Sequence, residues 1–273
     1  MSAIASPIFD RRSRACSPKT GNVSEREGQR FVGSVHAQVA GIGPEMTRKM
    51  TILAHRGNTL GPDPARENTL VACAAALADG FGLEIDLRRD HRGRFLISHD
   101  PTEWTPGSSI AGYTHIFAKY PERVIAVNVK ELGYLEMLIN EVTEGTFGRC
   151  AFLFDFELLE PANKGSAQRT IRSFAASCAV TLASRMSDRG EPIEECLAIP
   201  GEIVWADEFD RPWLTKQTID RVHAAGRQVY VVSPEIHGAD RATRLARWAA
   251  LNRWEVDGLC TDFAGEARVF FNR

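Results

Sequence analysis

The 273-residue chain is 44% hydrophobic and 25% charged, a composition that is typical of a globular protein. Its 33 basic and 35 acidic side chains give a formal net charge of −2, which excludes a generally basic protein that wraps nucleic acid. No run approaches the roughly 18 apolar residues that a membrane-spanning helix needs, so we expect no stable membrane insertion. The six cysteines form no C-x-x-C pair, and we expect reduced thiols and a cytoplasmic protein.

The charge is distributed unevenly along the chain. Residues 1–50 carry a net charge of +4, which leaves −6 for the other 223 residues. The first 45 residues also lack a sustained apolar period and are rich in Ser, Gly, Arg and Gln, a composition that favours disorder. We therefore expect a disordered extension over residues 1–49 and one folded domain over residues 50–273.

From residue 51 onward, short apolar runs alternate with segments of helical spacing. The expected strands cover residues 51–54, 83–87, 124–129, 151–156, 180–183, 203–206, 228–232 and 258–260, with an extra hairpin arm at 95–98. The expected helices cover residues 67–79, 134–142, 166–177, 192–198, 214–225 and 241–252, with a terminal helix that runs through residue 270.

Repeated alternation of strands and helices predicts a parallel sheet with helical crossovers. Eight such units in about 220 residues favour a single-domain α/β protein with a closed (β/α)8 TIM barrel over an open doubly wound sheet. The strand order is not readable from one sequence, so the open sheet stays an alternative. No Gly-x-Gly-x-x-Gly follows the first strand, which argues against a dinucleotide-binding fold.

In a barrel of this kind the chemistry belongs at the C-terminal ends of the strands. Nearly every expected strand delivers a polar side chain there, and Glu84 and Asp86, two residues apart, share one face of their strand. The polar residues at these ends are His55, Arg56, Glu84, Asp86, His99, Asp100, Asn128, Lys130, Asp155, Glu157, Ser184, Arg185, Asp207, Ser233, Glu235, His237, Thr261 and Asp262.

Four short motifs over residues 51–100 resemble the glycerophosphodiester phosphodiesterase family in order and spacing. They are His55-Arg56-Gly57, Glu67-Asn68-Thr69, Glu84-x-Asp86 and His99-Asp100. The family belongs to the phospholipase-C-like phosphodiesterases, which are TIM barrels, and the chain resembles a short, divergent member. Beyond residue 100, Lys130 and Thr261-Asp262 also fit the family pattern.

The resemblance implies a metal-dependent phosphodiester hydrolase with a small-molecule substrate. His55 and His99 would divide the acid and base roles, with Arg56 at the phosphate, because two near-neutral imidazoles suit the two proton transfers. Glu84 and Asp86 would bind a divalent cation, Mg²⁺ or Ca²⁺.

Further site residues are expected on the later strands. Asn128 stands where the family has its third metal carboxylate, and Asp155 could compensate for the missing charge. Lys130 is expected at the phosphate. The last three candidates are Asp207, Glu235 and His237. For each of them, contact with the substrate and support of the barrel mouth are about equally expected.

Several alternatives stay open. Glu84 and Asp86 could form a buried ion pair with Arg56 or Lys130, and Lys130 could pair with Asp155 or Glu84. Asn68 is expected to brace the loop or cap the first helix. The short segment 100–124 lacks the family's usual insertion, which weakens the expectation of glycerol specificity. The rival functions are a phospholipase-like or sphingomyelinase-D-like activity on lipids and a non-catalytic sugar-phosphate-binding barrel, with no nucleic-acid partner and an open oligomeric state.

Overall fold

The computed structural model describes residues 49–130, 137–138, 140–141, 151–154, 181–199 and 201–272, with the backbone alone for residues 151–154. All of these residues belong to one compact unit that spans residues 46–273. The extension expected over residues 1–49 lies outside the described residues except for Lys49, and Asp155 lies outside them as well.

The described residues form nine strands, and each expected strand is present. They are β1 (Thr51–His55), β2 (Gly82–Arg89), β3 (Phe95–Ile97), β4 (Ile125–Val129), β5 (Ala151–Phe154), β6 (Thr181–Ser187), β7 (Ile203–Asp207), β8 (Gln228–Val232) and β9 (Gly258–Thr261). Eight of them pair in parallel, in the order β1-β9-β8-β7-β6-β5-β4-β2, and β3 pairs antiparallel with β2 as the expected hairpin arm.

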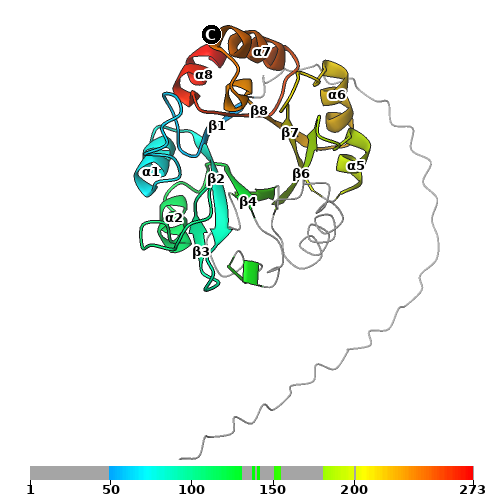
Figure 1. The fold of residues 1–273 in the computed structure, drawn as a ribbon. Helices are drawn as coiled ribbons and strands as arrows, with labels where there is room; N and C mark the ends of the chain where they lie inside the picture. The colour runs from blue at the N-terminus through cyan, green and yellow to red at the C-terminus, as the bar shows by residue number, and fades with distance from the viewer. Residues whose placement is uncertain are drawn as a thin grey trace, which may run out of the picture. The chain divides into compact units, whose positions relative to one another are not determined.

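The sheet curls so that strands distant in its order come together (Figure 1). β1 pairs with β9 along Thr51–Ala54 and also with β2, where His55 is opposite Glu84. The α/β class is therefore confirmed. The helix expected at 166–177 and most of that at 134–142 lie outside the described residues, so the complete set of eight helices remains a prediction.

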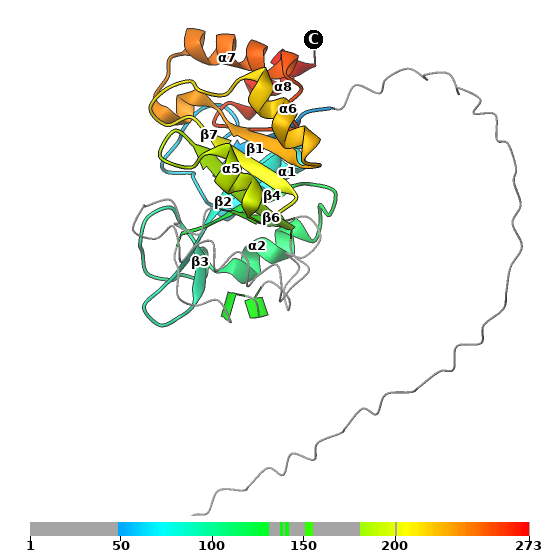
Figure 2. The same ribbon diagram turned by 90° about the vertical axis from the view of Figure 1, so that its right-hand side faces the viewer.

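The described helices lie outside the curled sheet (Figures 1 and 2). They are α1 (Leu70–Ala78), α2 (Ile110–Phe117), α5 (Ile193–Ala198), α6 (Lys216–Ala224), α7 (Arg241–Arg253) and α8 (Ala264–Phe271), with a short 3-10 helix η2 (Pro234–His237). No helix in this part of the chain is long and apolar enough to cross a membrane.

Three expectations about these elements need correction. The first helix begins at Leu70, because Thr69 is its N-cap and accepts a hydrogen bond from Ala72 N at 3.2 Å. The strand expected over 180–183 runs on to Ser187, so Ser184 and Arg185 lie within it. Helix α2 was missed in the segment 100–124, although Ile110, Tyr113 and Phe117 have helical spacing and are buried.

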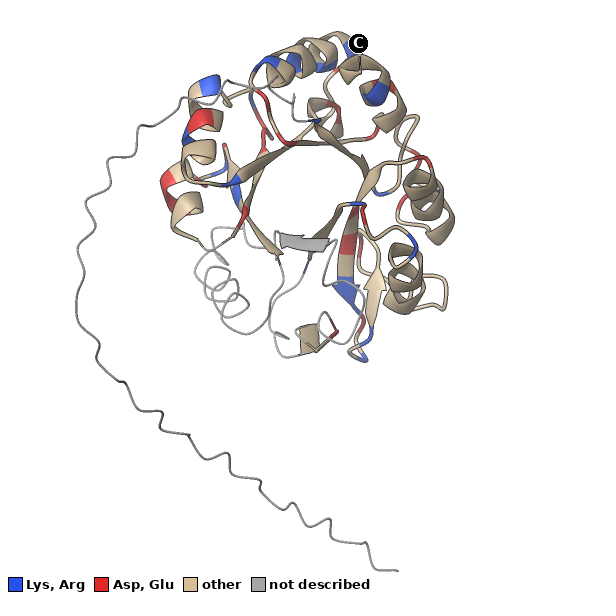
Figure 3. Ribbon diagram, turned by 180° about the vertical axis from the view of Figure 1, so that it is seen from behind, with Lys and Arg blue, Asp and Glu red and all other residues tan. Residues whose placement is uncertain are grey.

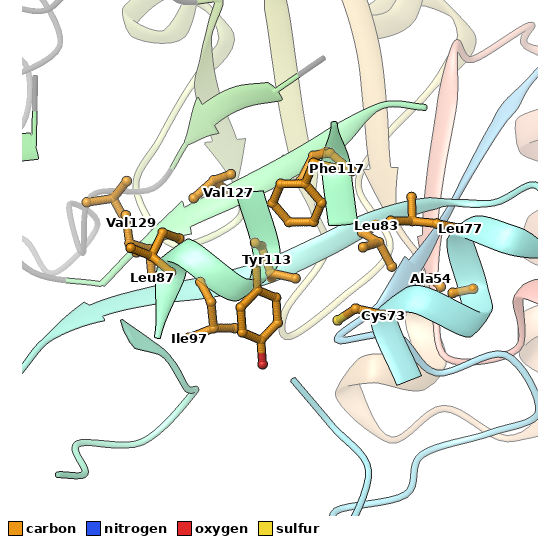
Figure 4. Packing of buried hydrophobic residues seen from close by; sticks show 14 of the residues in the cluster. Ala54, Cys73, Leu77, Leu83, Leu87, Ile97, Tyr113, Phe117, Val127 and Val129 are labelled. Atoms are coloured by element: carbon orange, nitrogen blue, oxygen red, sulfur yellow. The ribbon is translucent and has the colours of Figure 1, made fainter. Parts of the chain in front are cut away.

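Alternate residues of the strands pack on opposite sides of the sheet. On the outer side, Leu83, Ile85 and Leu87 of β2 share a core with Leu77 of α1 and Phe117 of α2 (Figure 4).

The inner side of the sheet has its own core. The residues there are Leu53, Ala126, Ala183, Ile203, Trp205, Tyr230, Val232 and Cys260, a buried cluster without a helix residue. Gly258 belongs to this layer, because a Cβ there would overlap the Tyr230 ring. This apolar layer fills the curl, and the polar residues follow it along several strands.

Charged positions occur both on the outer helices and on the strands of the ring (Figure 3). The buried acidic ones include Glu84 and Asp86 within β2 and Asp207 at the end of β7, with Asp262 directly after β9. Parallel pairing places Glu84 opposite His55, the last residue of β1, so these groups lie at the same edge of the sheet as the strand ends. The fold thereby gathers buried charge at one mouth.

Candidate active site

His55 is the last residue of β1 and is held by a carboxylate from the far end of the chain. Its Nδ1 lies 2.8 Å from Asp262 Oδ1, which also accepts a hydrogen bond from Asn58 Nδ2 at 2.8 Å. Its Nε2 lies 3.8 Å from Glu84 Oε2. Burial opposes the charge on His55, but the hydrogen bond with Asp262 and the negative charge of Glu84 outweigh it and raise the pKa of His55.

The sequence placed Asp262 in the family pattern but did not assign it a role. Burial of Asp262 would raise the pKa of its carboxyl, but the hydrogen bond and the charge from His55 lower it on balance. Asp262 is therefore an ionised acceptor for Nδ1–H, and it fixes the orientation of the imidazole with Nε2 on the opposite side. The sequence feature that could have indicated this role is the position of Asp262 directly after the last strand.

Two residues in the left-handed region shape the loop after β1. Arg56 has φ 51° and Asn68 has φ 56°, values that L-residues adopt at a cost. The Asn68 amide nitrogen donates to Arg56 O at 2.9 Å, and Arg56 NH1 donates to Glu67 Oε2 at 3.0 Å. Asn68 Nδ2 donates to Asp86 Oδ2 at 2.9 Å, so Asn68 is the expected loop brace, while the helix cap is Thr69.

Asp86 is surrounded by positive charge. Arg56 Nε lies 3.1 Å from Asp86 Oδ2, and Lys130 Nζ lies 3.7 Å from Asp86 Oδ1. The buried ion pair that the sequence left open is thus present at Asp86. Lys130 makes this ion pair with Asp86, and the pairing with Asp155 that the sequence also offered lies outside the described residues. Asp86 brings both cations to the mouth.

Unlike Asp86, Glu84 and Asn128 each have a buried side-chain oxygen without a hydrogen bond from the part of the chain that the structure describes. Neither Glu84 Oε2 nor Asn128 Oδ1 has a hydrogen-bond partner among the residues that the structure describes. Asn128 of β4 pairs in register with Asp86 of β2, and Asp86 comes two residues after Glu84 on that strand. Burial, together with the negative charge of Asp86, raises the pKa of Glu84 to about 7.

Unsatisfied buried oxygens are costly, and a hard divalent cation is the ligand that oxygen donors of this kind bind. Glu84, Asp86 and Asn128 therefore fit a Mg²⁺ or Ca²⁺ site in the chemistry of their donors. Asn128 contributes no charge, so the set carries two negative charges rather than three.

A second group of possible metal ligands lies on the hairpin. Ligand atoms of Asp90, His91 and Glu103 all lie within 4.8 Å of one another. The Asp90 carboxylate, however, accepts hydrogen bonds from Arg94 Nε at 2.9 Å and from the backbone of Arg92 at 3.0 Å. His91 and Glu103 are exposed. The hydrogen bonds from Arg92 and Arg94 already occupy the Asp90 carboxylate.

His99 follows the hairpin arm β3 and comes directly after Ser98. Ser98 N donates to Asp86 O at 2.9 Å, and Arg88 Nε donates to His99 O at 2.7 Å. These bonds fix the backbone that carries His99. Its Nδ1 lies 2.8 Å from Asp100 Oδ1, and 42% of its side chain is exposed, so the ring is accessible to a substrate.

The remaining predicted residues lie at the ends of β7 and β8. Asp207 Oδ1 is 2.6 Å from His237 Nε2. Glu235 accepts hydrogen bonds from the hydroxyls of Ser233 and Thr261 and from Asp262 N, the last at 3.2 Å. Glu235 thus braces the residue that orients His55.

Comparison with known proteins places this fold among solved phosphodiesterases. No family model and no curated protein matches the chain. A glycerophosphodiester phosphodiesterase from Agrobacterium tumefaciens str. C58 has a TM-score of 0.59 and 17% identity, covering 82% of this chain and all of that one. A glycerophosphoryl diester phosphodiesterase from Parabacteroides distasonis has a TM-score of 0.59 and 15% identity, covering 84% of this chain and 88% of that one.

A third solved structure contains a ligand. It is an Oleispira antarctica phosphodiesterase in complex with the product sn-glycerol-3-phosphate, with a TM-score of 0.57, 15% identity and coverage of 82% of this chain and 98% of that one. The class that the structure defines is thus an α/β protein with a curled parallel sheet and buried charge at its mouth. More particularly, the chain has the fold of the solved glycerophosphodiester phosphodiesterases, and the resemblance seen in the sequence is confirmed at the level of the fold.

Proposed function

We propose that this chain is a metal-dependent phosphodiester hydrolase of the glycerophosphodiester phosphodiesterase type, with a complete (β/α)8 TIM barrel over residues 50–273. Its substrate is a small glycerol- or sugar-type phosphodiester. The observation that carries the proposal is the His55–Asp262 pair, which orients the imidazole of His55. His55 Nε2 lies 3.8 Å from Glu84 Oε2, a buried oxygen that has no hydrogen-bond partner among the described residues. The fold shared with a phosphodiesterase that holds sn-glycerol-3-phosphate supports the substrate class.

Glu84, Asp86 and Asn128 would hold the divalent cation, and Asp155 is a further candidate ligand. Such a cation supplies positive charge that neutralises the phosphoryl oxygens of the substrate. Because Asn128 brings no charge, we expect a lower metal affinity than three carboxylates would give.

The protein's own side chains account for the other requirements of phosphodiester cleavage. A proton must leave the nucleophile, which is water or a neighbouring substrate hydroxyl, and a proton must reach the departing alkoxide. His55 and His99 divide these two transfers, and Asp262 keeps the reactive Nε2 of His55 available. Arg56 and Lys130, held beside the site by Asp86, add positive charge for the phosphate.

A non-catalytic sugar-phosphate binder is the second candidate, and the uncharged Asn128 is the observation that favours it. A binder would retain the charged pocket but would not need two histidines in acid and base roles. Turnover therefore separates the two functions.

The test is hydrolysis of bis(p-nitrophenyl) phosphate and of a glycerophosphodiester, with and without EDTA, followed by addition of Mg²⁺ or Ca²⁺. We expect metal-dependent turnover of both diesters, and His55→Ala and His99→Ala should each abolish turnover of the glycerophosphodiester, whose alkoxide leaving group needs a proton. The matched control is His115→Ala, which removes an exposed histidine on α2. Turnover of the glycerophosphodiester that survives either of the first two substitutions would contradict the proposed acid–base pair, and binding of phosphate esters without any turnover would favour the binder.

A further inference from the structure

Glu235 is the centre of a hydrogen-bond network that lies behind the His55–Asp262 pair. Its Oε2 accepts a hydrogen bond from the Ser233 hydroxyl. Its Oε1 accepts one from the Thr261 hydroxyl and another from Asp262 N, the latter at 3.2 Å. Ser233 directly follows β8, Thr261 ends the neighbouring strand β9, and both are fully buried. The Glu235 carboxylate therefore bridges the ends of two adjacent strands.

The network continues into helix α7, outside the sheet. Trp248 Nε1 donates to Ser233 Oγ at 2.7 Å. The Trp248 side chain is fully buried, and its ring packs edge-on against Phe270 of α8, with 5.6 Å between the ring centroids. Because a close-packed interior leaves such a ring little room to shift, α7 fixes the position of the Ser233 hydroxyl.

The direction of each hydrogen bond in the network is defined. An indole N–H and a backbone N–H can only donate, and a carboxylate can only accept. Ser233 Oγ therefore accepts from Trp248 and gives its own proton to Glu235. In the same way, Thr261 Oγ1 accepts from Phe263 N at 3.1 Å and donates to Glu235. Both hydroxyls thus have a single arrangement, which directs their protons to one carboxylate.

The network ends at the main chain of Asp262, whose side chain orients His55. Asp262 Oδ1 lies 2.8 Å from His55 Nδ1 and 2.8 Å from Asn58 Nδ2. On the backbone side, Asp262 N donates to Glu235, and Asp262 O accepts from Gly61 N at 2.9 Å. Loss of the Glu235 acceptor would release one of these backbone contacts. Any displacement of Asp262 moves the imidazole that it holds.

We propose that Glu235 is a positioning residue for proton transfer by His55. Ser233 and Trp248 support it from the side of helix α7. This role rests on the proposed function, in which His55 transfers a proton, and it assigns Glu235 to the support of His55 rather than to contact with the substrate. A misplacement of about 1 Å can cost on the order of 10²-fold in rate, so loss of Glu235 lowers kcat more than it changes KM.

Steady-state hydrolysis of the glycerophosphodiester, in the presence of Mg²⁺ or Ca²⁺, tests this role. We expect Glu235→Ala to lower kcat about 10- to 100-fold and to change KM by less than about two-fold. Glu235→Gln should recover most of the loss, because its amide oxygen still accepts from Thr261 and Asp262. Ser233→Ala, which removes the link to Trp248, should lower kcat by less than Glu235→Ala. An unchanged kcat in Glu235→Ala would overturn the inference.

The matched control is Glu208→Ala. Glu208 is a buried glutamate directly after β7 that accepts hydrogen bonds from Trp213 N at 2.7 Å and from Leu214 N at 2.8 Å. It also pairs with Arg247 of α7, so it is a brace of the same kind that does not contact Asp262. Its loss should lower Tm and leave kcat near the wild-type value. Equal losses of kcat in Glu208→Ala and Glu235→Ala would show a general effect of lost stability and refute the positioning role.

A proton NMR signal reports the position of His55 without turnover. In the metal-free wild type we expect a downfield signal from the Nδ1 proton shared with Asp262, identified by its absence in His55→Ala. Glu235→Ala should shift or broaden this signal, and Glu208→Ala should leave it unchanged. No such signal in the wild type, or the wild-type signal in Glu235→Ala, would refute the inference. Failure of the proposed function has a different signature, namely no diester turnover by the wild type, and the NMR signal alone then decides whether Glu235 positions the imidazole.

Discussion

Replacing Glu84 by Gln tests the buried carboxylate at the centre of the proposed metal site. The substitution keeps the shape of the side chain and removes its negative charge. Burial and the charge of Asp86 raise the pKa of Glu84 to about 7, from an ordinary value near 4.5. As the pH rises between these values, the unfolded chain releases the proton before the folded protein does, so the metal-free protein loses stability.

The pKa difference converts to roughly 3 kcal/mol of lost stability at pH 8, as an order of magnitude. Glu84→Gln should recover up to that amount in the metal-free protein at pH 8 and almost none at pH 4. For a domain of this size, about 2–4 °C of Tm corresponds to each kcal/mol, so the gain is at most about 6–12 °C.

Bound metal should reverse the comparison. A cation that binds only the folded state at 100 times its Kd stabilises it by about 2.7 kcal/mol. The wild type should therefore gain Tm when Mg²⁺ or Ca²⁺ is added at pH 8, and Glu84→Gln should gain little.

Thermal unfolding at pH 4 and pH 8, with EDTA or with metal, measures all of these effects. The matched control is Glu103→Gln in the exposed group on the hairpin, which should keep the wild-type response to metal. A Glu84→Gln protein that is less stable than wild type at pH 8 in EDTA would refute the argument from burial. An undiminished metal response in that variant would refute the placement of the cation.

Three further predictions concern the site and the core. Asn128→Asp should restore a third charged ligand and lower the Kd for Mg²⁺ or Ca²⁺ by calorimetry; an unchanged Kd would exclude position 128 as a ligand. Asp262→Asn should lower kcat by about 10²- to 10⁴-fold with little change in KM, because the His55 imidazole loses its orienting acceptor, and unaltered steady-state kinetics would contradict that role. Gly258→Ala should cost about 1–3 kcal/mol in denaturant unfolding, since its Cβ overlaps the Tyr230 ring, and wild-type stability would show that the ring can move at no cost.

The sequence located most of the fold because apolar runs of strand length are a local property. The strand expected at 228–232 coincides with β8, and the hairpin arm at 95–98 matches β3 to within a residue. Helix α2 was missed because its eight residues include a glycine and a β-branched threonine, which weaken the local helical signal.

In the candidate site, too, the sequence located residues but not the contacts between them. The positions of His55, Glu84, Asp86 and His99 were readable because they follow apolar runs in a family-like order. Which of them pair with one another was not readable. The partner of His55 is 207 residues away along the chain, and that of His237 is 30 residues away. No local pattern specifies such contacts.

The alternation of strands with helices and the polar residues at the strand ends were readable along the chain, because periodicity and residue type are local properties. How the charges are shared among these residues depends on the folded structure. It commits Asp86 to Arg56 and Lys130 and leaves oxygens of Glu84 and Asn128 without a hydrogen bond among the described residues. The physical reason is the curl of the sheet, which removes these side chains from water and fixes which groups can reach one another.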